Sequence, residues 1–382
     1  MSTLTSRKFA EKDKKELNDS FNKYTGRSRT IKQFEWEWLN TPEGEGSMWL
    51  LEDSATGRIV GYFGLIPIKF TYFGYSILTG KTENTFIHPP YAGKGLYYPF
   101  EVKFFEEASD RFGLFFTTMG CEAIGAIRLK LGYSSVGGYV TYIKAVQKSY
   151  LDKLLAAAIN RRIHNELIAN FLIAASKLTT IILMPLFRRR GPIDKAIKME
   201  KVTSIDAVAD ELDKFWERNR AKFGITVDRN SRYLKWRIFD NPHVDYEFFL
   251  AIRHGDTVGY LITKINGGKE AKSVAIVDII ADDNDEVIFN SILHNATESF
   301  KAGNIHLIQF YTLLSGNFLN KAFRRNGFVS LSILLKLMQM VLGKKEPEIL
   351  LMAKALDDSL DPSKVSNPAC WYFTDMLMEG IR

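Results

Sequence analysis

Short apolar runs separated by glycine turns dominate the first hundred residues. One run covers 48–52, and another group of aromatic and β-branched residues covers 70–77 around a turn at Gly74. Runs of this length and composition, with glycine between them, predict antiparallel strands joined by hairpins. A further strand is expected at 85–88, where Pro89 and Pro90 stop it.

The apolar period then lengthens from two residues to about four. Every fourth residue from Phe100 to Phe112 is apolar or alanine, which predicts a helix with one buried stripe. A buried strand is expected at 114–118, a short helix at 124–131 and a last strand at 139–146. Hairpin strands followed by helix, strand, helix and strand predict a layered α/β unit.

The same order of features occurs twice. Trp36 and Gly132 correspond to Trp236 and Gly327, at offsets of 200 and 195 residues. An offset that drifts so slowly over separate anchors indicates a duplicated fold. The matched segments are 34–42 with 233–242, 57–62 with 255–260, and 130–133 with 325–328.

We therefore expect an α/β chain made of two tandem mixed-sheet domains joined by a helical segment. The expected ranges are a first domain at 1–148, a helical linker at 149–200, a second domain at 201–350 and a C-terminal tail at 351–382. Two interpretations of the apolar stretch 151–187 stay open. It either packs across the two domains or lies in a membrane interface beside the basic flank 188–190.

Composition excludes several classes of protein. The net charge of +7 attracts anionic ligands, but no nucleic-acid recognition pattern accompanies it, so no nucleic-acid partner is expected. Two distant cysteines and six scattered histidines predict neither disulfides nor a metal site. With no apolar leader at the N-terminus, a cytoplasmic location is expected, with contact to the inner face of a membrane as the variant.

A glycine loop stands between the strand at 85–88 and the following helix. Its sequence is Ala92-Gly93-Lys94-Gly95-Leu96. Glycines in this place let successive backbone amides form a concave nest, and the helix N-terminus adds partial positive charge. The loop is therefore a candidate pyrophosphate site, to which Lys94 adds a cation.

The segment from His88 to Leu96 resembles the acyl-CoA motif of the GNAT acetyltransferase superfamily, and 130–133 resembles its closing Lys-Leu-Gly-Phe motif. The whole chain resembles bacterial GNAT proteins with two domains. The resemblance implies that Gly93, Lys94, Gly95 and Leu96 hold the CoA pyrophosphate. It also implies that Phe86, Ile87 and His88 pair with the pantetheine arm.

The resemblance implies direct attack of an amine on the acetyl-CoA thioester, without a metal. Glu83 is the expected general base, and an ordinary strand carboxylate is the alternative. Two positions depart from the family motif: Ala92 replaces a glutamine or arginine, and Tyr97 replaces a small residue. The usual general-acid tyrosine position holds Arg128, so that role does not carry over.

The second copy has no glycine loop. Four carboxylates between 282 and 286 would repel a pyrophosphate, so we expect no CoA site there. Asp278 is expected to touch substrate, with a structural role at a helix cap or a hairpin end as its alternative.

We expect an N-acyltransferase, with acetyl as the acyl group and a primary amine as the acceptor. The family resemblance favours an amino sugar of a surface-polysaccharide precursor. Two alternatives remain: an aminoacyl-tRNA-dependent transferase of the peptidoglycan type, and a non-catalytic GNAT-like protein.

Overall fold

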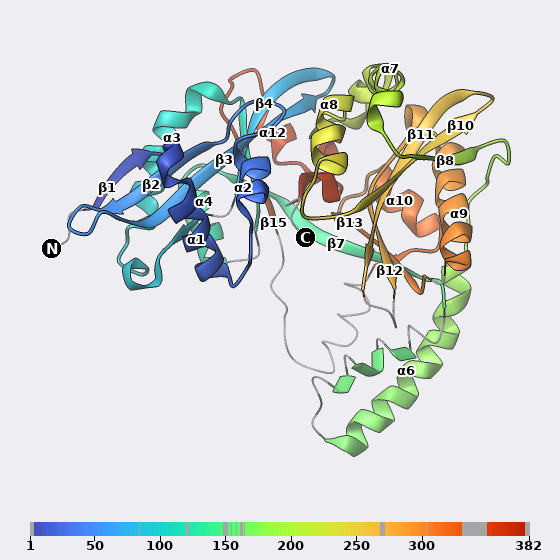
Figure 1. Ribbon diagram of the computed structural model, residues 1–382. Helices are drawn as coiled ribbons and strands as arrows, with labels where there is room; N and C mark the ends of the chain where they lie inside the picture. The colour runs from blue at the N-terminus through green and yellow to red at the C-terminus, as the bar shows by residue number, and fades with distance from the viewer. Residues whose placement is uncertain are drawn as a thin grey trace.

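The computed structural model describes residues 4–83, 85–119, 122–147, 165–267, 272–303, 305–330 and 350–378, with isolated positions between 152 and 163. Its described strands form one 15-stranded mixed sheet that runs through the whole molecule. Figure 1 shows helices on both sides of this sheet and the two halves of the chain side by side. The fold is thus α/β with two units, as the sequence predicts.

The first unit begins with a strand and two helices that precede its hairpins. The helix α3 follows the glycine loop, and Pro99 lies in its first turn, where a missing amide costs nothing. The elements are β1 (Leu4–Lys8), α1 (Lys14–Thr25), α2 (Ile31–Trp38), β2 (Ser47–Asp53), β3 (Arg58–Tyr72), β4 (Tyr75–Thr82), β5 (Phe86–Ile87), α3 (Tyr97–Ala108), β6 (Leu114–Met119), α4 (Glu122–Lys130) and β7 (Ser134–Ala145).

The second unit repeats this order. Its elements are β8 (Lys198–Val202), α7 (Ala209–Asn219), β9 (Ile225–Val227), α8 (Ser231–Leu234), β10 (Tyr246–Arg253), β11 (Asp256–Asn266), β12 (Ser273–Ala281), α9 (Glu286–Ala302), β13 (Leu307–Leu313), α10 (Phe318–Arg325) and β14 (Val329–Ser330), and the chain goes on to β15 (Leu350–Ala355) and α12 (Pro362–Val365). The matching order confirms the duplication that the sequence offsets indicate.

The units exchange strands at their junction. β15, from near the end of the chain, pairs with β6 of the first unit, while β7 of the first unit pairs with β13 of the second. β15 and the start of β7 also pair with each other. The sheet order is therefore β1-β2-β3-β4-β6-β15-β7-β13-β12-β11-β10-β8. β8 begins inside the range expected as the linker (149–200). β15 begins at residue 350, next to the range expected as the tail.

Trp36 and Trp236 join the units on one side of the sheet. Each indole Nε1 donates to the backbone carbonyl of the other tryptophan, at 2.9 and 3.0 Å, and the rings stack with their centroids 4.8 Å apart. Two residues 200 positions apart thus make the same contact in both directions. This reciprocity is the geometry of a local two-fold axis between duplicated units.

The helix α6 (Glu166–Phe187) stands apart from the rest of the molecule, and in Figure 1 it extends below the sheet. Its C-terminal end is fixed by Phe187, which is buried in a small cluster with Ala145 of β7. None of the described helices is both long enough and apolar enough to cross a bilayer.

Candidate active site

The strands β4 and β6 part at the centre of the first unit. They pair in parallel only from Thr79↔Leu114 to Lys81↔Phe116, although β6 continues to Met119. Beyond this point the chain stays on β3 instead, where Phe86 pairs with Tyr62. The sheet thus opens between the end of β4 and the end of β6. A gap of this kind exposes strand edges to which an extended ligand can add backbone hydrogen bonds.

A β-bulge lies at the opening. The register of β4 on β3 places Thr82 opposite Leu65, whereas Phe86 lies opposite Tyr62, so one extra residue lies between the two pairs. Beyond it, the His88 amide donates to the Val60 carbonyl at 2.7 Å. Because alternate residues of an antiparallel strand point their amides to opposite edges, the Ile87 amide points away from β3 toward the opening. Bulges commonly redirect backbone groups beside active sites.

The glycine loop leads from this strand to α3. Gly93 and Gly95 have φ angles of +75° and +72°, which glycine adopts without strain, and a Cβ added at either position would meet no atom within 4 Å. Among the described residues, no hydrogen-bond acceptor is found for the amides of Gly93, Lys94 and Gly95. The loop is exposed, and it presents free donors at the start of a helix, which suits an anionic phosphate group.

Two tyrosines frame the loop. The Tyr91 hydroxyl donates to Asp53 at 2.6 Å and anchors the loop to the end of β2, and the Lys94 ammonium lies 5.3 Å from the Tyr91 ring centre. The Tyr97 ring turns toward the sheet, where it packs 5.8 Å from the Phe63 ring and its hydroxyl lies 3.2 Å from Thr85 Oγ1. Tyr97 thus lines the opening beside the bulge.

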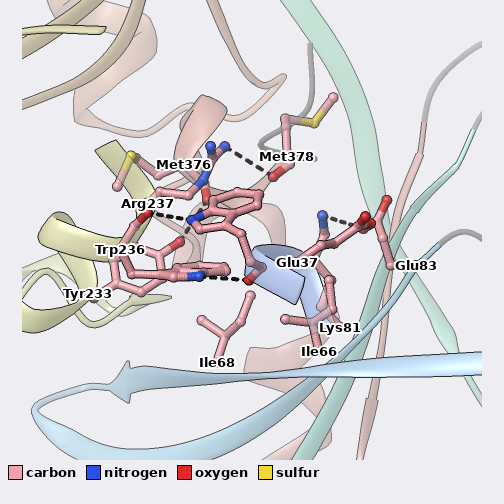
Figure 2. A pocket seen from close by; sticks show the side chains of 11 residues that line it. Glu37, Ile66, Ile68, Lys81, Glu83, Tyr233, Trp236, Arg237, Met376 and Met378 are labelled. Carbon is pink, nitrogen blue, oxygen red and sulfur yellow. Dashed lines mark hydrogen bonds and ion pairs between the residues drawn. The ribbon is translucent and has the colours of Figure 1, made fainter. Parts of the chain in front are cut away.

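Glu83 lies at the other end of the opening, in a small cavity between the two units. Figure 2 shows its carboxylate facing the Lys81 ammonium, at 2.5 Å. Both side chains are at least 94% buried. In an ion pair the carboxylate carries its charge, so it can accept a proton. The cavity has room for about one water molecule, about 20 Å³.

Further charged side chains surround the same cavity. Glu37 of α2 is buried and pairs with Arg29 at 2.6 Å. From the second unit, Arg237 donates to the Tyr246 hydroxyl and to two carbonyls near the end of the chain, one of them that of Met378 (Figure 2). The two carboxylates are each paired with a cation, and the Trp36 and Trp236 rings form an aromatic wall on which an ammonium group can pack.

Tyr133 approaches the end of β4 from the opposite face of the sheet. Its hydroxyl lies 3.5 Å from Thr82 Oγ1, whereas Lys81 and Glu83 point to the cavity side, as alternate residues of a strand do. Burial raises the pKa of Tyr133, against the opposing charge of Arg128. The tyrosine is therefore protonated at neutral pH and can serve as a proton donor.

Arg128 has a structural position. Its guanidinium forms a buried ion pair with Glu101 of α3 and lies over the Phe63, Phe105 and Tyr133 rings. Cys121, which the sequence places near the end of β6, lies outside the described residues.

His88 lines an open groove against α1. Its Nε2 lies 3.2 Å from the Ser20 hydroxyl, and the groove volume is about 880 Å³. Most of the charged side chains here are cations: Lys12, Lys15, Lys23 and Arg58, against Glu16 and Asp19. The groove adjoins the glycine loop through Pro90 and Tyr91, and its excess of cations adds to the attraction of anions there.

Asp278 is completely buried in the second unit. Its carboxylate accepts hydrogen bonds from Arg229 Nε and the Tyr260 hydroxyl, both at 2.7 Å, and from the Thr374 hydroxyl at 2.8 Å. These contacts tie β12 to the C-terminal segment and leave the carboxylate no surface toward a substrate. In place of the glycine loop, Asp282 to Asn284 form a short turn before α9.

The structure places the predicted residues Glu83, Phe86 and Ile87 and the loop 93–96 along one edge of the opening. The sequence prediction missed Glu37, Lys81 and Tyr133. The alternation of Lys81 and Glu83 on one strand face was a usable signal, as was a glutamate amid the buried aromatics of α2.

Solved structures with the same fold include several acyltransferases. A probable N-acyltransferase from Enterococcus faecalis V583 has a TM-score of 0.62 at 13% identity, over 93% of this chain and 73% of that chain. N-myristoyltransferase from Saccharomyces cerevisiae with bound myristoyl-CoA has a TM-score of 0.54 at 11% identity, over 93% and 83%. A tandem GNAT protein from the clavulanic acid pathway has a TM-score of 0.52 at 11% identity, over 94% and 100%.

At this level of identity the similarity establishes the fold, which is a tandem GNAT fold. No protein-family model matches the sequence. No curated protein sequence matches it either.

Proposed function

We propose that the chain is an acyl-CoA-dependent N-acyltransferase whose donor site lies in the first unit. The observation that carries this proposal is the order in which the chain places three features: the parted strands β4 and β6, the Ile87 amide and the amides of Gly93, Lys94 and Gly95. An extended pantetheine arm fits the strand edge, and a pyrophosphate fits the loop. In acyl-CoA the pantetheine arm is joined to the pyrophosphate, so the two groups can lie on the strand edge and in the loop at the same time.

The acceptor amine would approach from the cavity between the units. Glu83 takes a proton from the acceptor ammonium, directly or through water, and the free amine attacks the thioester carbonyl carbon. The carbon–sulfur bond then breaks, the nitrogen loses its second proton to water, and an amide forms; this proton restores the group that protonates the leaving thiolate. A backbone amide at the bulge would stabilise the negative charge on the carbonyl oxygen.

The departing thiolate needs a proton. Tyr133 is on the donor side of β4 and is held protonated by burial, so we propose it as the source. The net reaction converts a thioester and an amine into an amide and free CoA.

We propose acetyl as the acyl group and an amino sugar of a surface-polysaccharide precursor as the acceptor class. The carboxylates around the cavity support a cationic amine. Turnover of a panel of amino sugars and other primary amines with acetyl-CoA and longer acyl-CoAs tests both assignments. Reaction only with amines outside the sugar class would overturn the acceptor class.

Isothermal titration with acetyl-CoA tests the donor site. We expect micromolar affinity, and at least a tenfold loss in Gly93→Asp because a carboxylate then faces the pyrophosphate. Gly57→Asp is the matched control, since Gly57 also has a positive φ and open space around it but lies in the β2–β3 turn. If no acyl-CoA binds to the unaltered protein, the proposal fails in favour of an aminoacyl-tRNA-dependent or a non-catalytic role.

Steady-state kinetics test Glu83. We expect Glu83→Gln to lower kcat about 100-fold or more, with acetyl-CoA affinity unchanged. Because this variant leaves Lys81 buried without its partner, the double variant Lys81→Met/Glu83→Gln serves as the folding control. Activity near that of the unaltered protein in either variant would exclude Glu83 as the base.

A further inference from the structure

Exposed apolar side chains form a stripe along the described part of α6 from Leu167 to Ile181. Its most exposed large residues follow the helical period: Leu167, Phe171, Leu178 and Ile181 are 56–82% exposed. A helix of a soluble protein ordinarily shows polar residues on this side. From Leu167 to Ile181 the stripe is about 20 Å long at 1.5 Å per residue. An exposed apolar strip of this length marks an interaction surface.

A basic pocket lies where α6 meets the second unit. Its volume is about 450 Å³, and α6, β7 and α9 contribute to its walls. The cationic residues that line it are Lys144, Arg188, Arg189, Arg190 and Lys301, and His294 lies among them with a pKa that burial lowers below its ordinary value. Glu298 is the one carboxylate among the lining residues, and Lys301 pairs with it at 2.6 Å.

The positive charge of this pocket is largely uncompensated. Among the described residues, no ion pair joins an acid to Arg188, Arg189 or Arg190, and all three are exposed. Lys144 donates to a neutral carbonyl, that of Asn326, at 2.6 Å. Burial lowers the pKa of Lys144 to about 8, so it is still mostly charged at neutral pH. Converging cations with a single acid, which Lys301 already pairs, are suited to a phosphate group.

The apolar stripe and the basic pocket lie on the same helix, because Met184 and Phe187 of α6 line the pocket and Arg188 directly follows the helix. We propose that together they dock the protein on a bilayer that contains anionic phospholipid. The stripe enters the boundary between headgroups and acyl chains, and the pocket binds lipid phosphates at the same surface. A soluble phosphate compound would explain the pocket but not the stripe, whereas a lipid surface explains both.

Flotation with phosphatidylcholine vesicles, with and without phosphatidylglycerol, tests the proposal on the full chain. We expect binding only when phosphatidylglycerol is present, and weaker binding as salt is raised. Reversing the three arginines to glutamate (R188E/R189E/R190E) should weaken binding by at least tenfold, given roughly fivefold per cation at the surface. Leu167→Ser/Phe171→Ser/Leu178→Ser should abolish binding at any salt concentration.

Two matched variants control for charge and for hydrophobicity. K214E/R232E/K321E makes the same change of net charge at exposed positions on α7, α8 and α10. Tyr75→Ser/Ile265→Ser removes exposed apolar side chains elsewhere. Both should float as the unaltered protein does, and thermal melting checks that every variant folds.

Several outcomes would overturn the proposal. They are absence of flotation, equal binding to uncharged vesicles, and unchanged binding by either test variant. A thermal shift with inorganic phosphate or pyrophosphate and no vesicle binding would assign the pocket to a soluble ligand instead. If the serine variant loses a dimer rather than lipid binding, as light scattering would show, the stripe is covered by a second copy.

Discussion

At the scale of single residues, the buried charge of Asp278 is matched by a partner rather than exposed to a ligand. Arg229 and Asp278 form an ion pair with no solvent-exposed surface on either side chain. The sequence could place Asp278 on a buried strand, but it could not show that Arg229, 49 residues earlier, faces it. Removal of one partner of such a pair leaves an uncompensated charge in the core.

We therefore expect Asp278→Ala to lower the free energy of unfolding by about 3–5 kcal/mol. Urea denaturation followed by circular dichroism measures this. Glu247→Ala is the control, because Glu247 pairs with Lys201 at the surface, where the loss should stay below about 1 kcal/mol. Equal effects of the two variants would contradict a structural role for Asp278.

His243 predicts an acid dependence of stability. Burial and then the nearby Arg29 lower its pKa to about 4, and its ring meets Trp36 edge-on at the junction of the units. As the pH falls below 6.5, His243 becomes protonated in the unfolded chain, whereas in the folded chain it stays neutral until about pH 4. Folding stability should therefore fall between pH 6.5 and 4, by on the order of 1–2 kcal/mol after allowance for solvent.

The variant His243→Phe should lose less stability over the same range. Urea titrations of both proteins at several pH values between 7 and 4 give the comparison. Parallel curves would show that other groups cause the acid sensitivity.

At the scale of elements, glycines allow helices to lie close against strands. The Trp38 ring of α2 covers Gly64 of β3, where an added Cβ would lie 2.3 Å from the ring. The hydrophobic pattern predicts single strands and helices, because periodicity is local. It does not predict that Gly64 contacts the Trp38 ring, because that contact depends on how the two elements pack against each other.

Gly64→Ala should therefore destabilise the fold by about 1–3 kcal/mol through overpacking. A thermal melt would show the loss as a lower Tm. At Gly316 an added Cβ would meet nothing within 4 Å, so Gly316→Ala should leave Tm nearly unchanged. A Tm equal to that of the unaltered protein in Gly64→Ala would mean that α2 can move away at no cost.

At the scale of the whole molecule, the exchange of β7 and β15 makes each unit depend on the other. The repeat offsets in the sequence predict two units, and the described structure bears this out. The exchange is not visible in the sequence, since β15 and β6 are more than 230 residues apart and no local pattern encodes such pairing. Likewise the loop at 93–95 is visible as a motif, whereas the cavity around Glu83 needs residues from both halves.

A chain that ends at residue 330 should fail to fold, because β6 and β7 would lose the strand between them. Solubility and amide exchange of the expressed fragment measure this. A split between 163 and 164 removes no described strand, so fragments 1–163 and 164–382 expressed together should purify as one complex. A stable, soluble 1–330 fragment would contradict the interdependence of the units.

The distance between β6 and β15 also affects how the protein is made. Met119 is synthesised about 230 residues before its partner Leu350. At a translation rate of roughly 5–20 residues per second, the delay between the two is about ten seconds or more. During that time the nascent first half has an open hydrogen-bonding edge beside the donor site. Chaperone binding, or slow translation of the last segment, should therefore govern the yield of active protein.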